Sequence, residues 1–92
     1  MQALRQPRLD AAALGELCLA HLAESPERLA RFMEVAGYDP AGLRKAVGSE
    51  HLARGLIDYF AANEALMLAL CAGAELRPED FMRVWYRHNR AN

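Results

Sequence analysis

The feature that most constrains the fold of this chain is an uninterrupted apolar run within residues 63–73. Eight consecutive apolar residues stand between Asn63, which suits a helix N-cap, and Gly73, which suits a left-handed helix end. A helix that is apolar on every side is expected to be buried on every side, and the run is far shorter than the roughly 20 residues that span a bilayer. We therefore predict that residues 63–73 form the buried central helix of a small bundle, with Leu66 and Leu68 in the core.

The rest of the chain is typical of short helices separated by capping residues. Ser25 and Asp39 each precede a proline that fits the first helical turn, and Asp10 and Ser49 offer further caps. Apolar side chains recur at helical spacing, and no stretch alternates as a strand does. We predict an all-α fold, a compact bundle of five to six short helices, at about residues 10–24, 26–36, 40–47, 50–62, 63–73 and 78–88.

One glycine interrupts a predicted helix. Gly55 lies inside residues 50–62, where an interior glycine costs about 0.8–1 kcal/mol relative to alanine. We expect it to mark a close contact between helices.

Length and charge indicate one small domain. The 92 residues carry 11 basic and 12 acidic side chains, and the net charge of −1 gives no overall attraction to nucleic acid or to a membrane surface. We interpret residues 1–8 as a flexible arm that lacks a signal peptide, and residues 9–92 as a single helical domain. Cys18 and Cys71 are then expected to be reduced core thiols in a cytoplasmic protein.

Two groups of residues, around Pro26 and around Glu64, carry a resemblance to a protein family. They are Ser25-Pro26-Glu27-Arg28-Leu29, Arg31-Phe32, Gly37-Tyr38-Asp39-Pro40-Ala41, Leu43-Arg44 and Ile57-Asp58-Tyr59-Phe60-Ala61-Ala62-Asn63-Glu64-Ala65-Leu66. Over about residues 9–80, this order is similar to a family of short, uncharacterised helical proteins found mainly in alphaproteobacteria and classed as a domain of unknown function. The resemblance implies an all-helical bacterial protein of the cytoplasm, and it transfers no catalytic or ligand-binding residue.

The chain departs from that family at two places. Family members often carry aspartate where Asn63 stands, so this chain keeps the cap but loses a charge. The tail of this chain, residues 85–90, is also richer in aromatic and basic side chains than the family's ends.

Metal ligation has one weak set of candidates. Cys18 and His21 are spaced for one helix face, and Cys71 would join them only if the two helices pack together. Such residues on apolar faces usually belong to a core, and no compact ligand motif is present. We expect no metal site and no cofactor.

Catalysis has few candidates. Asp58 beside Tyr59 is expected to pair with Arg54, Glu64 opposes a helix dipole, and His51 lies in a first turn. Because no phosphate-binding loop is present and no nucleophile stands beside a base, we expect no catalytic residue and no enzyme activity.

The best candidate for a binding surface is the C-terminal helix. Arginine and aromatic side chains dominate the energetics of protein interfaces. Trp85 shares a stripe with Phe81 and is expected to face the core, whereas Tyr86 is expected to be exposed, and Glu79 is expected to pair with Arg83. The candidate partner-binding residues are Arg83, Trp85, Tyr86, Arg87 and Arg90. We expect a protein-interaction or adaptor module that contacts another protein or a second copy of itself.

Nucleic-acid binding is the alternative. Residues 26–47 resemble a helix-turn-helix in outline, with Arg44 and Lys45 on the later helix, and the basic and aromatic C-terminal helix offers a second route. Phosphate contact needs clustered positive charge, and the sequence pI near 6.3 does not favour it.

Overall fold

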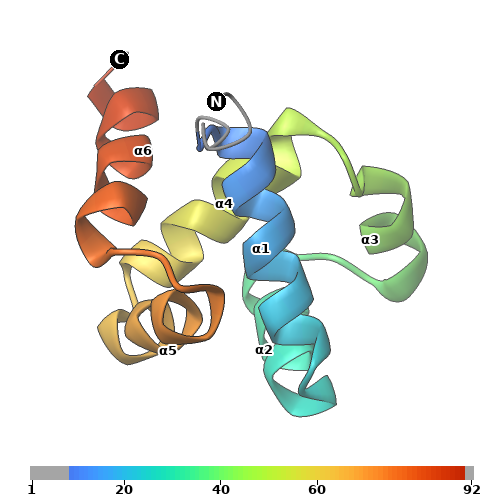
Figure 1. Ribbon diagram of the computed structural model, residues 1–92. Helices are drawn as coiled ribbons and strands as arrows, with labels where there is room; N and C mark the ends of the chain where they lie inside the picture. The colour runs from blue at the N-terminus through green and yellow to red at the C-terminus, as the bar shows by residue number, and fades with distance from the viewer. Residues whose placement is uncertain (1–8, 91–92) are drawn as a thin grey trace, which may run out of the picture.

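The computed structural model describes residues 9–90, which form six helices and no strand (Figure 1). The helices are α1 (Ala11–Ala23), α2 (Pro26–Ala36), α3 (Pro40–Ala46), α4 (Glu50–Ala61), α5 (Glu64–Ala74) and α6 (Pro78–Arg90). The predicted all-α bundle is confirmed, and the helix bounds lie close to the predicted ones. The interpretation of residues 1–8 as an arm lies outside the described residues.

Capping side chains begin five of these helices as predicted. Each side-chain oxygen accepts a hydrogen bond from the backbone N–H three residues later, which satisfies a donor that has no partner within the helix. The N···O distances are 2.9 Å at Asp10, 3.4 Å at Ser25, 2.7 Å at Asp39, 3.1 Å at Ser49 and 3.4 Å at Asn63. The helix starts are therefore determined locally.

The end of α5 differs from the prediction. Gly37 and Gly48 follow α2 and α3 with φ of 84° and 89°, as a left-handed glycine should. Gly73, in contrast, stays inside α5, and Glu75 takes the left-handed conformation with φ of 55°. The longer helix brings the half-buried Leu76 against the core, and the Leu76 amide donates to the Cys71 carbonyl at 2.9 Å.

The core is centred on the pair α1 and α4, which cross in the middle of the bundle (Figure 1). A Cβ added at Gly15 in α1 would lie 2.7 Å from the Ala53 Cβ and 2.9 Å from the Ala53 Cα, so the two helices approach too closely for any larger residue there. The contact predicted at Gly55 is wrong, because Gly55 is exposed and has no atom within 4 Å of its Cβ position. The buried side chains of the two helices are Leu14, Cys18, Leu22, Leu52, Ala53, Leu56, Ile57 and Phe60.

The position predicted for α5, buried on every side, is wrong. It buries Met67, Leu70 and Cys71 on one face, while Leu66 is half-buried and Leu68 is 44% exposed. The centre is already filled by α1 and α4, and so small a chain has no further layer to cover an outer face. That outer face consists largely of small residues, Ala65, Ala69, Ala72 and Gly73, whose exposure costs little.

Helices α2, α3 and α6 each bury one or two side chains against this centre. Phe32 in α2, Leu43 in α3, and Phe81 and Val84 in α6 are buried. The short helix α3 stands to one side of the bundle in Figure 1.

No single helix within residues 9–90 is long and apolar enough to cross a membrane. Helices α4 and α5 pass that test of length and composition only together, and they are bent by 110° at the break between them.

Candidate functional site

The aromatic residues of the predicted binding surface lie side by side on α6. Phe81 and Val84 point into the core, Trp85 is half-buried against its edge, and Tyr86 is 58% exposed. The Trp85 and Tyr86 rings meet edge to face, with centroids 5.1 Å apart and planes at 71°. This is a favoured geometry for an aromatic pair. Trp85 thus forms the inner part of the surface and Tyr86 the outer part.

Asp58 of α4 fixes this aromatic pair to the bundle. The Trp85 Nε1–H donates to Asp58 Oδ1 at 2.9 Å, and His88 Nε2 lies 3.5 Å from the same oxygen. The predicted pairing of Asp58 with Arg54 is not formed, because the Asp58 carboxylate faces α6 instead. Asp58 therefore joins α4 to α6 and holds the indole in one orientation.

The arginines of α6 fall into two classes. Arg83 Nη1 binds Asp80 Oδ1 at 2.7 Å, whereas the predicted partner of Arg83 was Glu79. The hydrogen bond from Arg83, with Arg77 also nearby, lowers the pKa of the Asp80 carboxyl. Arg87 and Arg90 are exposed and form no ion pair with any described residue. Of the five candidate partner-binding residues, Tyr86, Arg87 and Arg90 are therefore the ones that are exposed and not engaged by an acidic side chain.

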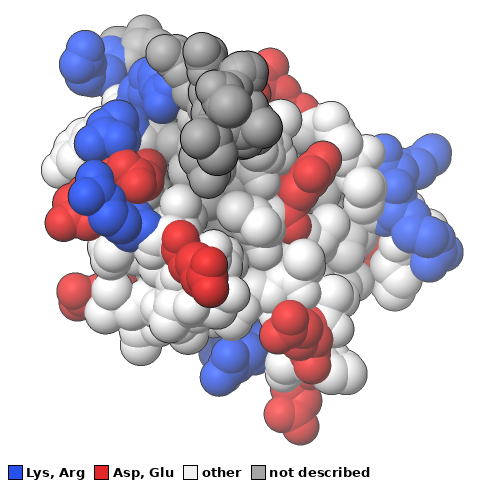
Figure 2. Space-filling view, viewed as in Figure 1, with Lys and Arg blue, Asp and Glu red and all other residues white. Residues whose placement is uncertain are grey.

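Positive charge is scattered over the view in Figure 2. Arginine and lysine side chains form separate groups over α6 on one side and α3 on the other, with acidic side chains between them. Arg44 and Lys45 are exposed on α3, which has seven residues. Nothing in this arrangement favours the helix-turn-helix alternative at residues 26–47, because that alternative needs a continuous basic face.

The metal-ligand candidates lie in the core. Cys18 and Cys71 are buried and free, and burial raises the pKa of both thiols. The His21 ring packs edge-on against Phe60, with centroids 6.0 Å apart. Among residues 9–90, no three His, Cys, Asp or Glu side chains gather closely enough to hold a metal ion.

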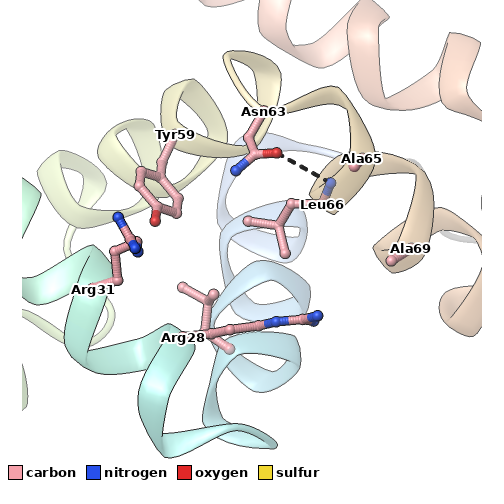
Figure 3. A pocket seen from close by; sticks show the side chains of 8 residues that line it. Arg28, Arg31, Tyr59, Asn63, Ala65, Leu66 and Ala69 are labelled. Atoms are coloured by element: carbon pink, nitrogen blue, oxygen red, sulfur yellow. Dashed lines mark hydrogen bonds between the residues drawn. The ribbon is translucent and has the colours of Figure 1, made fainter.

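Two surface hollows lie away from α6, and the sequence predicted neither. One, of about 450 Å³, lies between α1, α4 and the turn before α4, and its lining is mainly apolar. The other, of about 270 Å³, lies where α1, α2, α4 and α5 meet, and Arg28 and Arg31 are among the residues that line it (Figure 3). Glu27 and Arg31, although four residues apart on α2, form no ion pair with each other. A sign of this hollow in the sequence is that Arg28 and Arg31 stand three residues apart on either side of Leu29 and close to Phe32, which is buried.

The described helices pack around α1 and α4 and together form a small all-α domain. The family model of DUF3572, a protein of unknown function, matches residues 8–88, and the chain belongs to that family. No curated protein and no solved structure matches the chain. The resemblance to a domain of unknown function is therefore confirmed over nearly the whole domain, and it brings no activity with it.

Proposed function

We propose that this domain is a non-enzymatic protein-interaction module of the cytoplasm and that it presents α6 to another protein. The observation that carries the proposal is the Trp85–Tyr86 pair, which is held by the hydrogen bond from Trp85 to Asp58 and lies beside the unpaired Arg87 and Arg90.

Two physical arguments support this surface. Tyrosine, tryptophan and arginine are the residues most enriched among those that dominate binding energy. A side chain that is already held in place also loses less conformational entropy when a partner binds, and the anchored indole meets that condition. The partner best suited to this surface carries an apolar side chain for Tyr86 and carboxylates for Arg87 and Arg90.

The test is a triple substitution of the available residues, Tyr86→Ala, Arg87→Ala and Arg90→Ala. We expect capture of cytosolic partners to fall at least about tenfold, since loss of a hot spot costs 2 kcal/mol or more. The melting temperature should stay near that of the parent, because none of the three side chains is buried. If the triple variant lost thermal stability to the same degree as partner capture, the proposal that this surface binds a partner would be rejected.

A matched control removes two exposed basic residues elsewhere, Arg44→Ala and Lys45→Ala on α3. This variant should capture the same partners as the parent. Nuclease treatment distinguishes a protein partner from nucleic acid. If the captured material is recovered only when nucleic acid is intact, the nucleic-acid alternative is favoured. Light scattering of the purified chain shows whether the partner is a second copy.

A further inference from the structure

We propose that the hollow of about 450 Å³ between α1, α4 and the turn before α4 binds an extended basic segment of another protein, in which an apolar side chain is flanked by lysine or arginine. We call this hollow the α1–α4 groove. No residue of α6 lines the groove, so this proposal does not depend on the surface proposed for α6.

The groove results from the way α1 and α4 cross (Figure 1). Gly15 of α1 and Ala53 of α4 both line it, and a Cβ added at Gly15 would lie 2.7 Å from the Ala53 Cβ. Neither residue has side-chain atoms beyond Cβ, so neither can fill the space beside the crossing. Ala12, one turn earlier on α1, is exposed and also lines the groove. Because the helix crossing itself forms the groove, a partner need not open the bundle in order to bind.

Apolar side chains that line the groove remain accessible to a partner. Val47, in the turn before α4, is 56% exposed, and Leu19 of α1 is half-buried. Leu52 and Leu56 also line the groove but are almost fully buried, so they add little contact surface. A partner's apolar side chain that packs against Val47 or Leu19 removes apolar surface from water, which is the main driving force of association. The volume of about 450 Å³ has room for such a side chain, since ligand sites hold roughly 300–1,000 Å³.

The charged side chains that line the groove are all acidic within the part of the chain that the structure describes. Asp10 caps α1, Glu50 stands in the first turn of α4, and Glu16 is exposed on α1. None of the three forms an ion pair with a described residue. Glu16 has no role at a helix start, and the residues three and four positions from it on α1 are alanines and a leucine. The groove is therefore complementary in charge to a basic partner.

The spacing of these carboxylates favours an extended partner over a single small cation. Asp10 and Glu16 are six positions apart, which corresponds to about 9 Å along a helix axis. An ion pair needs an N···O distance within about 4 Å, so one ammonium group is not expected to serve both. In an extended peptide, side chains two positions apart point to the same face. A leucine with a lysine two positions before it and another two positions after it therefore presents one apolar and two basic groups together.

The experiment is an NMR titration of the full ¹⁵N-labelled chain with the peptide acetyl-Lys-Ser-Leu-Ser-Lys-amide at constant ionic strength. The peptide should give saturable shifts of backbone amides at the start of α1, in the turn before α4 and at the start of α4. Two matched peptides, with serine in place of the leucine or glutamate in place of both lysines, should bind at least about fivefold more weakly. Absence of saturable shifts at these amides, or equal binding of either matched peptide, would overturn the proposal.

A charge variant tests the carboxylates. It combines Asp10→Asn, Glu16→Gln and Glu50→Gln, and asparagine caps a helix as well as aspartate does. We expect the affinity for the lysine peptide to fall about tenfold, because the ion pairs to both lysines are lost. The melting temperature should stay close to that of the parent, since all three residues are exposed. Unchanged affinity in this variant would refute the site.

The matched control removes three exposed carboxylates that lie outside the groove, with Glu24→Gln, Glu27→Gln and Glu34→Gln. It changes the net charge by the same amount, and Glu27 stands in the first turn of its helix as Glu50 does. The affinity of this control for the peptide should equal that of the parent. An equal loss would show that binding reflects only net charge and would overturn the proposal.

Val47→Ser tests the apolar contact. The affinity for the lysine peptide should fall about fourfold, the loss expected when one methylene group is no longer buried. Val35→Ser on α2 is the matched control, because Val35 is 67% exposed and lies outside the groove, and this variant should bind as the parent does. The same affinity in both variants would contradict the proposed contact.

Two other occupants of the groove are separated by the same titration. Residues 1–8 carry Arg5 and Arg8, and the double variant Arg5→Gln and Arg8→Gln of the full chain should bind the peptide as the parent does. A tenfold gain would assign the groove to residues 1–8, and an affinity that falls as the protein concentration rises would assign it to a second copy. Either result would overturn the proposal. The assay needs no cytosolic partner and leaves α6 unchanged, so its failure is distinct from failure of the α6 surface.

Discussion

Helices α1 and α5 are both almost wholly apolar, yet the bundle buries them to different extents. In α1, Leu14, Cys18 and Leu22 are 0% exposed, whereas in α5 Leu68 is 44% exposed. The difference lies in where the large and the very small residues stand. Gly15 lets α4 approach the large side chains of α1, while the alanines of α5 occupy an outer face that none of the helices within residues 9–90 covers. Apolar content alone therefore does not identify the central helix.

Replacing a leucine by alanine should give the largest difference in stability between α1 and α5. Leu14→Ala in α1 should lower the free energy of unfolding by about 2–5 kcal/mol, because it leaves a cavity in a fully buried site. Leu68→Ala in α5 should change it by only about 0.5 kcal/mol, as is usual for surface positions. Urea unfolding of both variants measures the difference. Equal costs would mean that α5 is as central as α1.

Glycine replacement should give a smaller effect whose sign differs between sites. Gly15→Ala should destabilise the protein by about 1–3 kcal/mol, because the new methyl group meets the Ala53 Cβ and backbone. Gly55→Ala and Gly73→Ala should each stabilise it by about 0.4–1 kcal/mol, since both positions are helical and have open space. Thermal unfolding of the three variants checks the signs. A neutral Gly15→Ala would contradict the close approach of α1 and α4.

The smallest effect concerns Asp80 near the junction between α5 and α6, where the carboxylate pairs with Arg77 and Arg83 at the surface. Because the pKa of Asp80 is lowered below its ordinary value of 3.8, the folded state binds this proton less readily than the unfolded chain. The contribution of Asp80 to stability is therefore present above about pH 4 and is lost as the pH falls through the lowered pKa. Asp80→Asn should flatten that part of the stability profile slightly. An unchanged profile would show that the Arg83–Asp80 pair contributes nothing.

Local features of the fold were predictable, and non-local ones were not. Asp10, Ser25, Asp39, Ser49 and Asn63 cap their helices through contacts three residues away, and such contacts can be inferred from a short stretch of sequence. The approach of Gly15 to Ala53 joins separate helices, so periodicity within one helix carries no sign of it. The same holds for the hydrogen bond from Trp85 to Asp58, which spans 27 positions.

In the candidate sites, too, local features could be predicted from the sequence and non-local ones could not. Exposure of Tyr86 was predictable from its place beside the apolar stripe of α6, and the composition of that helix indicated a binding surface. The partners of the charged residues were predicted poorly, because several acidic neighbours lie within reach of each arginine and packing decides among them. Arg28 and Arg31 line a hollow only because residues of other helices, among them α4 and α5, form its other walls, and the sequence does not show that these helices meet.

Helices α1 and α5 each contain one of the two cysteines. Cys18 in α1 is 0% exposed and Cys71 in α5 is 3% exposed. Both thiols are shielded, and burial raises the pKa of each, so alkylation requires the surrounding structure to open. Because α5 is the more peripheral helix, Cys71 should be modified at lower denaturant concentration than Cys18. The two alkylation rates therefore report the order in which the helices leave the bundle, without any label being introduced.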